Sequence, residues 1–203
     1  MTNFSCILFD LGGVLVNWDN LWIIQEVSEK FHLSENQLKI KFEKNLKDYS
    51  SGKFDEMEFW NKIGRAINSS DLENLEKSLY SEIVPSKISV NNYVYDISKK
   101  LKKSGYIIGI VSNTELAIYS LVEKIMPTTH FDYKFLSFQI GVVTPDVQIF
   151  EHVLEKLSMP KEKILYIDDD IKNIELTQSL GIDSIHFITN QKLSKELEKR
   201  NLS

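Results

Sequence analysis

Three loops that carry carboxylates or a hydroxyl follow three short apolar runs of this chain. Asp10 comes directly after residues 6–9, Ser112 follows residues 107–111, and three consecutive acids begin at Asp168, after residues 164–167. In a parallel sheet the carboxyl ends of the strands lie along one edge, and open α/β sheets bind their ligands there. We therefore expect these side chains to gather at one site. Carboxylates together with a hydroxyl predict a bound cation and an anionic substrate.

Each of these segments also has an ordinary structural interpretation. An aspartate close to glycines is typical of a turn, and capping of a helix would account for one of the three acids. Thr114 is expected to cap a helix over residues 115–125, while Ser112 faces the ligand. Three acids in a row repel one another unless a cation lies among them, and Mg²⁺ binds through one or two carboxylates plus water and phosphate. The acidic segment therefore favours Mg²⁺ as the cofactor.

The periodicity of apolar residues divides the chain into two regions. Strand-like runs alternate with helical patterns over most of it, which predicts an α/β fold with a doubly wound parallel sheet. From about Asn20 to Tyr80, apolar residues recur at helical spacing, which predicts an inserted bundle of about four helices. We expect strands at 6–9, 106–111, 133–138, 164–167 and 184–188, and helices at 90–103, 115–125 and 194–200. The predicted domains are an α/β core of residues 1–16 and 84–203 and a helical cap of residues 17–83.

Local signals place several helix ends. Ser34, followed by Gln37, resembles a helix start with a capping box, and Ser70-Asp71 resembles the start of a last short helix of the cap. Pro145 fits the first turn of a helix that ends near Leu157. Gly181 suits the C-terminal cap of a helix that ends at Leu180.

Composition argues against several functional classes. The chain has 24 Lys and Arg against 29 Asp and Glu, a formal charge of −5, whereas a nucleic-acid-binding protein needs a concentrated basic face. The one basic cluster, residues 99–103, falls late in a predicted helix, where cations suit the helix dipole. Cys6 is the only cysteine, so no disulfide framework is possible. No apolar run reaches transmembrane length and no signal peptide precedes the first strand, so we expect no membrane contact and a cytoplasmic location.

Four segments, in order along the chain, resemble the four motifs of the haloacid dehalogenase (HAD) superfamily. The chain is similar to the branch with a helical cap inserted after the first motif, and to its sugar-1-phosphate phosphatases. The resemblance covers essentially the whole length and implies a HAD-like Rossmannoid core. The segments are Phe9-Asp10-Leu11-Gly12-Gly13-Val14, Val111-Ser112-Asn113-Thr114, residues 141–150 around Thr144-Pro145, and Tyr166-Ile167-Asp168-Asp169 with Asn173.

The resemblance implies a role for each matching residue. Asp10 would be the nucleophile that takes the phosphoryl group as an aspartyl-phosphate. Ser112 and the amide of Asn113 would hold phosphate oxygens, with Thr144 beside them. The partner would be a small phosphorylated metabolite, such as a sugar phosphate. The ligands of Mg²⁺ would be Asp10, the backbone carbonyl of Gly12, Asp168 and Asp169.

Two positions depart from the family pattern. Gly12 replaces the usual second aspartate, whose acid–base help is typically worth about 10²–10⁴ in rate. Thr144 replaces a lysine, and losing such a charge-stabilising donor typically costs about 10²–10³. Lys134 could reach in as a substitute, although an exposed strand lysine is the simpler interpretation. The alternative to a phosphatase is thus an impaired HAD-like protein that acts as a binding module. A dehalogenase, which uses no metal, leaves the acids at residues 168–170 less explained.

The stretch that leaves the core contains Trp18, Asp19 and Trp22. Two interpretations carry equal weight: these residues face the site, or the two tryptophans, four apart, pack within the cap. The histidines are not at metal-ligand spacing, and none is assigned to catalysis.

Overall fold

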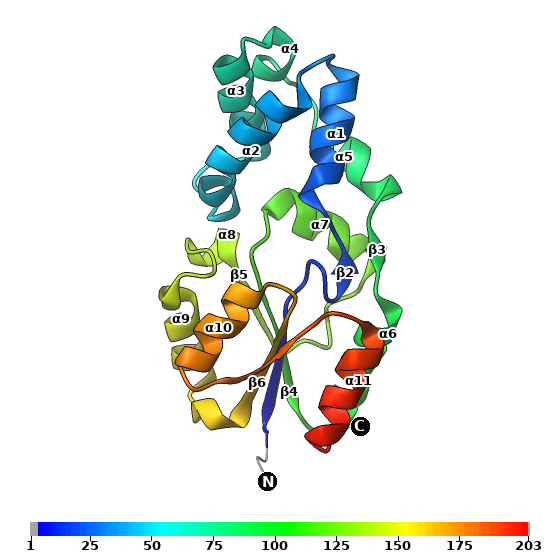
Figure 1. Cartoon of the computed structure of the whole chain (residues 1–203), viewed down its shortest axis with the longest axis vertical. Coiled ribbons are helices and arrows are strands. Elements are labelled where there is room, and N and C mark those ends of the chain that lie inside the picture. The colour runs from blue at the N-terminus through cyan, green and yellow to red at the C-terminus, as the bar shows by residue number, and fades with distance from the viewer. Residues whose placement is uncertain (1–3, 203) are drawn as a thin grey trace.

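Five parallel strands form the central sheet of the computed structural model, which describes residues 4–202 (Figure 1). Their order is β5-β4-β1-β6-β7, and β1 is flanked by β4 and β6 in register, with Phe9 beside Ile110 and Ile167. The segments that follow β1, β4 and β6 therefore emerge at the same edge. This arrangement confirms the predicted parallel α/β fold. The strands are β1 (Cys6–Phe9), β4 (Ile107–Ser112), β5 (Tyr133–Leu136), β6 (Ile164–Asp168) and β7 (Asp183–His186).

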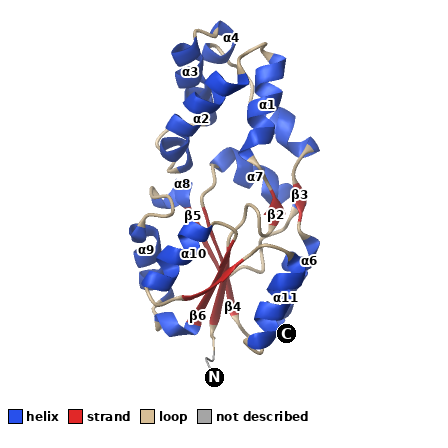
Figure 2. Cartoon of the chain, viewed as in Figure 1, coloured by secondary structure: helices blue, strands red, loops and turns tan. Residues whose placement is uncertain are grey.

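Helices cover both faces of the sheet (Figure 2). Side chains of β1 alternate between the faces: Cys6 and Leu8 pack with α9, whereas Ile7 and Phe9 belong to the larger core with α6, α7 and α11. This continuous burial explains why the strands are apolar runs. The core helices are α6 (Asn92–Lys103), α7 (Leu116–Ile125), α8 (Ser137–Ile140), α9 (Val147–Leu157), α10 (Ile171–Ser179) and α11 (Asn190–Lys199), with 3₁₀ turns η1 (Val84–Ser86) and η2 (Lys161–Lys163).

A helical bundle lies over the carboxyl edge of the sheet (Figure 1). Its interior is a cluster of aromatic rings, in which Tyr49 stacks on Phe59 at 4.4 Å between centroids and Phe59 meets Trp60 edge to face at 5.1 Å. The helices are α1 (Asn20–Lys30), α2 (Glu35–Ser50), α3 (Glu56–Ile67), α4 (Ser70–Glu73) and α5 (Leu79–Ile83). The inserted bundle was predicted, although it holds five helices within residues 20–83 instead of about four. The domain limits at 16/17 and 83/84 remain a prediction.

Two short strands connect this bundle to the sheet. Strand β2 (Val16–Asn17) pairs antiparallel with β3 (Ser89–Val90), and Asn17 Nδ2 donates to Ser89 Oγ at 2.8 Å. The backbone N–H of Asn91 donates to the carbonyl of Leu15 at 2.9 Å, which extends the ladder toward the core. The outgoing and returning connections therefore form one stem.

Two predicted element boundaries were wrong. Strand β5 ends at Leu136, before the predicted limit at Phe138, because Ser137 begins α8 and its hydroxyl donates to the carbonyl of Ser50 at 2.6 Å. Pro145 precedes helix α9, which starts at Val147 and is capped by Asp146.

Of the predicted helix caps, Ser34 and Gly181 were confirmed and Ser70 was wrong by one residue. Ser34 caps α2 as predicted, and its side chain accepts from the N–H of Gln37. Helix α4 is capped by Ser69, one residue before the predicted Ser70. Gly181 has φ +81° and follows the end of α10, as its predicted capping role requires.

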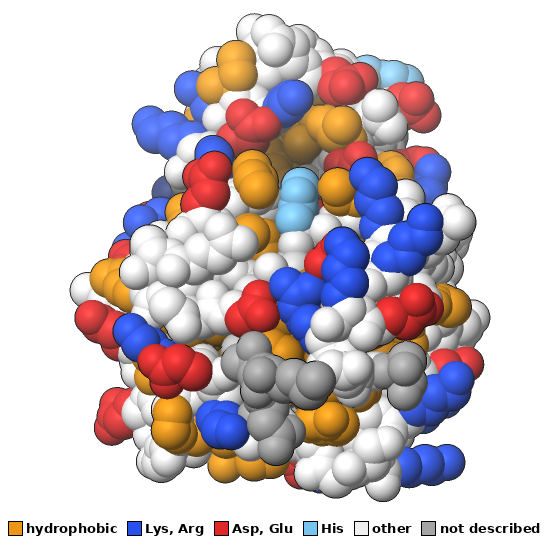
Figure 3. Space-filling view, turned by 60° about the horizontal axis from the view of Figure 1, so that its bottom comes forward, with side chains coloured by type: hydrophobic (Ala, Val, Ile, Leu, Met, Phe, Trp, Pro, Cys, Tyr) orange, Lys and Arg blue, Asp and Glu red, His pale blue; other side chains and the backbone are white. Residues whose placement is uncertain are grey.

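The surface carries charges of both signs. On the face drawn in Figure 3, Lys and Arg side chains are interspersed with Asp and Glu side chains. Within residues 4–202, none of the helices combines the length and the apolar character that a membrane crossing requires.

Candidate active site

Three carboxylates converge where β1 and β6 end. Asp10 follows β1, Asp168 is the last residue of β6, and Asp169 is the next residue. One carboxylate oxygen from each lies within 4.8 Å of the other two. Phe9 of β1 lies beside Ile167 of β6, so the next residues, Asp10 and Asp168, come close together.

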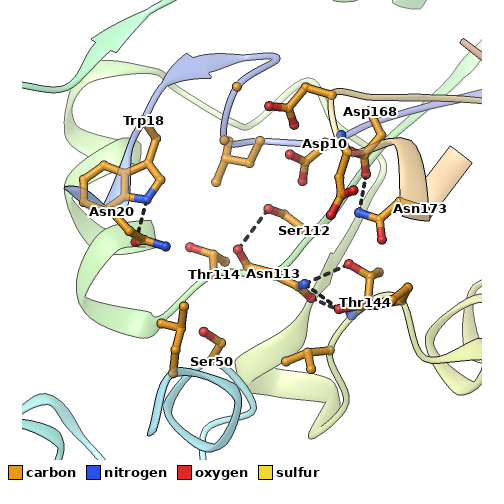
Figure 4. Close-up of a pocket in the computed structure, with 18 of the residues that line it drawn as sticks. Asp10, Trp18, Asn20, Ser50, Ser112, Asn113, Thr114, Thr144, Asp168 and Asn173 are labelled. Atoms are coloured by element: carbon orange, nitrogen blue, oxygen red, sulfur yellow. Dashed lines mark hydrogen bonds between the residues drawn. The ribbon is translucent and has the colours of Figure 1, made fainter. Parts of the chain in front are cut away.

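Asp168 is the most firmly held of the three. Its Oδ2 accepts hydrogen bonds from the Tyr166 hydroxyl and from Asn173 Nδ2, the latter at 2.9 Å (Figure 4). Its Oδ1 accepts from the backbone N–H of Asp170 at 2.6 Å. The carboxylate is thus preorganised by the strand before it and by the first turns of α10.

The electrostatics of the cluster favour a cation. Burial, and then the charge of Asp168, raise the pKa of Asp10 well above its ordinary value, against a lowering contribution from the Ser112 hydroxyl. Burial raises the pKa of Asp168 to about 6 and also raises that of Asp169. These carboxylates hold negative charge that the surrounding residues do not neutralise. Such a set of oxygen ligands fits a divalent cation of the Mg²⁺ type.

Gly13 is required for this geometry. A Cβ atom on Gly13 would lie 2.1 Å from Oδ2 of Asp169, and the residue has φ +78°. Only glycine permits both the left-handed backbone and the close approach of the carboxylate. The sequence motif contains this residue, but its reason becomes visible only in three dimensions.

Asn113, in the loop after β4, is hydrogen-bonded to Thr144, in the loop before α9. Asn113 Nδ2 donates to Thr144 Oγ1 at 2.8 Å and to the Thr144 carbonyl at 3.0 Å, while its Oδ1 accepts from the Thr144 N–H at 2.7 Å. The side-chain amide of Asn113 is therefore engaged with the protein. Ser112, which ends β4, is buried and lines the same cavity as Asp10.

A cavity of about 1040 Å³ extends from the acid cluster to the cap. Its lining includes all the predicted site residues, Asp10, Gly12, Ser112, Asn113, Thr144, Asp168 and Asp169. It also includes Trp18, Asp19 and Asn20 from the stem and first turn of α1, and Glu43, Leu46, Lys47 and Ser50 from α2. The cap thus forms one wall of the candidate site.

Comparison with known proteins agrees with this architecture. The model of the family described as haloacid dehalogenase-like hydrolase matches residues 7–187. The chain belongs to this family.

Curated relatives of this HAD-like hydrolase have different activities. Sesquiterpene phosphatase astK of Aspergillus oryzae is 22% identical over 199 residues, which cover 98% of this chain and 97% of that protein. D-ribitol-5-phosphate phosphatase of Bacteroides thetaiotaomicron is 22% identical over 192 residues, 88% of this chain and 89% of that protein. Drimenol cyclase drtB of Aspergillus calidoustus is 23% identical over 94% of this chain, which spans only 35% of that relative.

Among solved structures, a HAD family enzyme of Bacteroides thetaiotaomicron in a magnesium complex is similar to this chain with a TM-score of 0.76. The two chains are 24% identical over 90% of this chain and 92% of that one. This likeness confirms the fold.

One contact between cap and core was not predicted. Glu115 lies at the start of α7, is 7% exposed, and accepts a hydrogen bond from the hydroxyl of Ser50 at the end of α2. Burial raises its pKa to about 7. No motif of the HAD-like family marks this residue, and its partner is 65 residues away in the sequence.

Thr114 does not cap α7, contrary to the prediction. The helix begins after Glu115 without a side-chain hydrogen bond at its cap, and Thr114 Oγ1 has no partner among residues 4–202. The N–H of Thr114 donates instead to the hydroxyl of Ser137. Thr114 is one of the residues that line the cavity, while its hydroxyl oxygen is buried.

Of three further residues, Lys134 lies away from the cavity, whereas Trp18 and His186 line it. Lys134 is paired with Glu123 at 3.6 Å and does not line the cavity, so it does not replace the missing lysine. Trp18 meets both expectations, because it lines the cavity and packs edge to face on Trp22 at 6.1 Å. His186 was assigned no role, yet it lines the cavity and has Nε2 3.0 Å from the Asp169 carbonyl oxygen.

Proposed function

We propose that this chain is a Mg²⁺-dependent phosphatase of a small phosphate monoester, such as a sugar phosphate. The observation that carries the proposal is the convergence of Asp10, Asp168 and Asp169 within 4.8 Å at the floor of a cavity. One carboxylate of such a cluster can serve as a nucleophile while its neighbours hold a metal. The names of the phosphatase relatives are consistent with this chemistry but refer to different substrates.

Asp10 is assigned as the nucleophile. One of its oxygens attacks phosphorus, the bond from phosphorus to the ester oxygen breaks, and the alcohol leaves with a proton taken from water. Water then attacks the aspartyl-phosphate, which returns Asp10 as a carboxylate and releases inorganic phosphate. The Ser112 hydroxyl and the backbone N–H of Asn113 are assigned to phosphate oxygens.

The metal would be held by Asp10, Asp168, Asp169 and the backbone carbonyl of Gly12. When bound, Mg²⁺ supplies positive charge that draws phosphate to a group of carboxylates and offsets charge on the transferring group. Asp168 is fixed for this purpose by Tyr166, Asn173 and the Asp170 N–H.

The two departures from the family pattern predict a slow enzyme. With Gly12 in place of a carboxylic acid, the leaving oxygen has no general acid at that position, so esters with good leaving groups should react fastest. Thr144 contributes no positive charge beside Asp10. Among the described residues that line the cavity, Lys47 of the cap is the one lysine or arginine.

The test is a set of phosphate esters assayed with Mg²⁺ and with EDTA. We expect Mg²⁺-dependent release of phosphate by the parent and none by Asp10→Asn. Equal activity of Asp10→Asn and the parent on p-nitrophenyl phosphate would remove the proposal. The circular dichroism spectra of Asp10→Asn and the parent are compared, so that a loss of activity can be distinguished from unfolding of the variant.

The alternative is a catalytically impaired HAD-like protein that binds a phosphorylated metabolite. Two observations favour it: Thr144 fills the lysine position and its side chain is hydrogen-bonded to Asn113, and Lys134 is paired with Glu123. Phosphate binding without turnover, measured by calorimetry with Mg²⁺ present, distinguishes this alternative from a phosphatase.

A further inference from the structure

Positive charge is scarce in the wall of the cavity. Eight aspartates and glutamates line it, whereas Lys47 of α2 is the one lysine or arginine among its described lining residues. These acids repel a phosphate dianion, so a positive charge in addition to the metal would favour its approach. The core does not supply that charge through Thr144, and Lys134 is paired with Glu123 away from the cavity. The acids are Asp10, Asp19, Glu43, Glu115, Asp146, Asp168, Asp169 and Asp170.

Lys47 is exposed, and none of the ion pairs among residues 4–202 involves it. Glu43, one turn earlier on α2, is paired with Lys39 at 3.9 Å. Asp48, the next residue, is paired with Lys53 at 2.6 Å. A lysine presents three donors on a flexible four-carbon stem. The ammonium group of Lys47 can therefore turn to an anion in the cavity without first breaking an ion pair within the described part of the chain.

The end of α2 that carries Lys47 is fixed to the core beside the proposed phosphate site. Ser137 Oγ donates to the carbonyl of Ser50 at 2.6 Å and accepts from the backbone N–H of Thr114 at 3.0 Å. One hydroxyl thus joins the cap to the loop after β4, to which phosphate oxygens are assigned. In Figure 4, Thr114 lies between Ser50 and Ser112.

Helical geometry directs Lys47 toward the same loop. Lys47 lies three residues before Ser50, so both side chains share the face of α2 that lines the cavity, about 4.5 Å apart along the helix axis. Glu43 and Leu46 complete this face. The extended stem of a lysine is longer than that separation, so the ammonium group can reach past Ser50 to the loop after β4.

We propose that Lys47 binds the phosphoryl group that is transferred, so that the cap supplies the positive charge that Thr144 does not supply. This inference rests on the proposed function and adds a catalytic residue to it. The ammonium group would donate to a phosphoryl oxygen and offset the charge of the transferring group. Turnover would then depend on the position of the cap, because Lys47 enters the site from α2.

Substitution of Lys47 in two backgrounds tests this role. kcat/KM for p-nitrophenyl phosphate is measured with Mg²⁺ for Lys47→Met and Lys47→Arg in the parent, and for Lys47→Met in Thr144→Lys. In the parent we expect Lys47→Met to lose about 10- to 100-fold and Lys47→Arg to lose less. In Thr144→Lys we expect Lys47→Met to lose less than about threefold, because the core then supplies the charge. No loss in the parent, or equal losses in both backgrounds, overturns the inference.

Lys44→Met is the matched control. Lys44 lies on the same helix, is exposed and is not among the residues that line the cavity, so its replacement changes the net charge by the same amount. We expect kcat/KM of Lys44→Met to stay within about twofold of the parent, since solvent screens a charge outside the site. The nitrophenyl group of the substrate is uncharged, so a loss on this ester cannot arise from an anion elsewhere in the substrate. Equal losses for Lys44→Met and Lys47→Met overturn the inference.

A binding measurement applies whether or not any ester is hydrolysed. Kd for inorganic phosphate is measured by calorimetry with Mg²⁺ for the parent, Lys47→Met and Lys44→Met. We expect only Lys47→Met to bind more weakly, by about tenfold, because it loses a charge-assisted hydrogen bond. Equal Kd values, or no binding of phosphate by the parent, overturn the inference. If the parent hydrolyses no ester while Lys47→Met alone binds phosphate more weakly, the proposed function fails and the binding role of Lys47 stands.

Discussion

Thr144 is held to Asn113 by three hydrogen bonds, two of which involve backbone atoms of Thr144. Only the bond from Asn113 Nδ2 to Thr144 Oγ1 depends on the threonine side chain. This loop should therefore keep its conformation when the side chain at position 144 is changed.

Thr144→Lys is accordingly expected to increase phosphatase activity. An ammonium group in this cavity would offset the charge of Asp10 and of the phosphate, and the gain should be about tenfold or more, since loss of such a donor typically costs about 10²–10³. The measurement is kcat/KM for p-nitrophenyl phosphate with Mg²⁺. Thr144→Met, of similar length and without charge, is the control, and equal effects of the two variants would show that charge is not the missing factor.

Gly12→Asp should restore a general acid. A Cβ atom on Gly12 would lie 3.6 Å from Cδ1 of Trp18, which is an ordinary contact, so the position has room for a Cβ atom. Acid catalysis helps poor leaving groups most, and we expect up to about 10²-fold acceleration for an alkyl phosphate with little change for p-nitrophenyl phosphate. Gly12→Asn is the matched control. A uniform change for both esters would contradict acid catalysis.

Gly13→Ala should weaken binding of Mg²⁺. The added Cβ would lie 2.1 Å from Oδ2 of Asp169, so the carboxylate must move from its place in the acid cluster. Gly141→Ala is the matched control, because Gly141 has φ +86° and a Cβ atom added to it would meet no described atom within 4 Å. Both variants should lose about 1 kcal/mol from backbone strain. Only Gly13→Ala should lose the rise in Tm that Mg²⁺ produces in the parent.

Glu115 should make stability depend on pH. Burial raises its pKa from 4.5 to about 7, so between these values the folded protein keeps a proton that the unfolded chain releases. Its contribution to the free energy of unfolding is full below about pH 4.5 and is lost as pH rises through about 7, on the order of 1–3 kcal/mol. Glu115→Gln should therefore be more stable than the parent at pH 8 and similar to it at pH 5.

Urea unfolding in EDTA at both pH values measures this effect. Glu151→Gln, at an exposed position of α9, is the control and should show no such difference between pH 5 and pH 8. A stability difference between Glu115→Gln and the parent that is the same at both pH values would contradict the assignment.

The sheet could be predicted because each of its central strands is a short run of apolar residues in the sequence. Continuous burial of β1 and β6 produces apolar runs, and each run ends at the acid that the sheet edge then brings into the cluster. The spatial approach of Asp10, Asp168 and Asp169 follows from parallel register, which alternating strands and helices imply.

Features that depend on contacts between distant segments could not be predicted. Thr114 looked like a cap because its type and position suit one, but the hydroxyl of Ser137, 23 residues away, takes its backbone N–H. Strand β5 was predicted too long because Phe138 continues its apolar pattern, whereas the backbone from Ser137 onward turns into α8 against the cap. Glu115 has no local pattern at all, since its burial is created by α2 of the cap.

The stem of β2 and β3 has a consequence for how this architecture can vary. All five strands of the sheet lie outside the segment between Asn17 and Ser89, and that segment starts and finishes at paired residues. The insert therefore contributes no strand to the five-stranded sheet, whatever its length. The covalent connection between insert and core is thus confined to one paired position, while Ser50 of the insert also contacts Glu115 and Ser137 of the core.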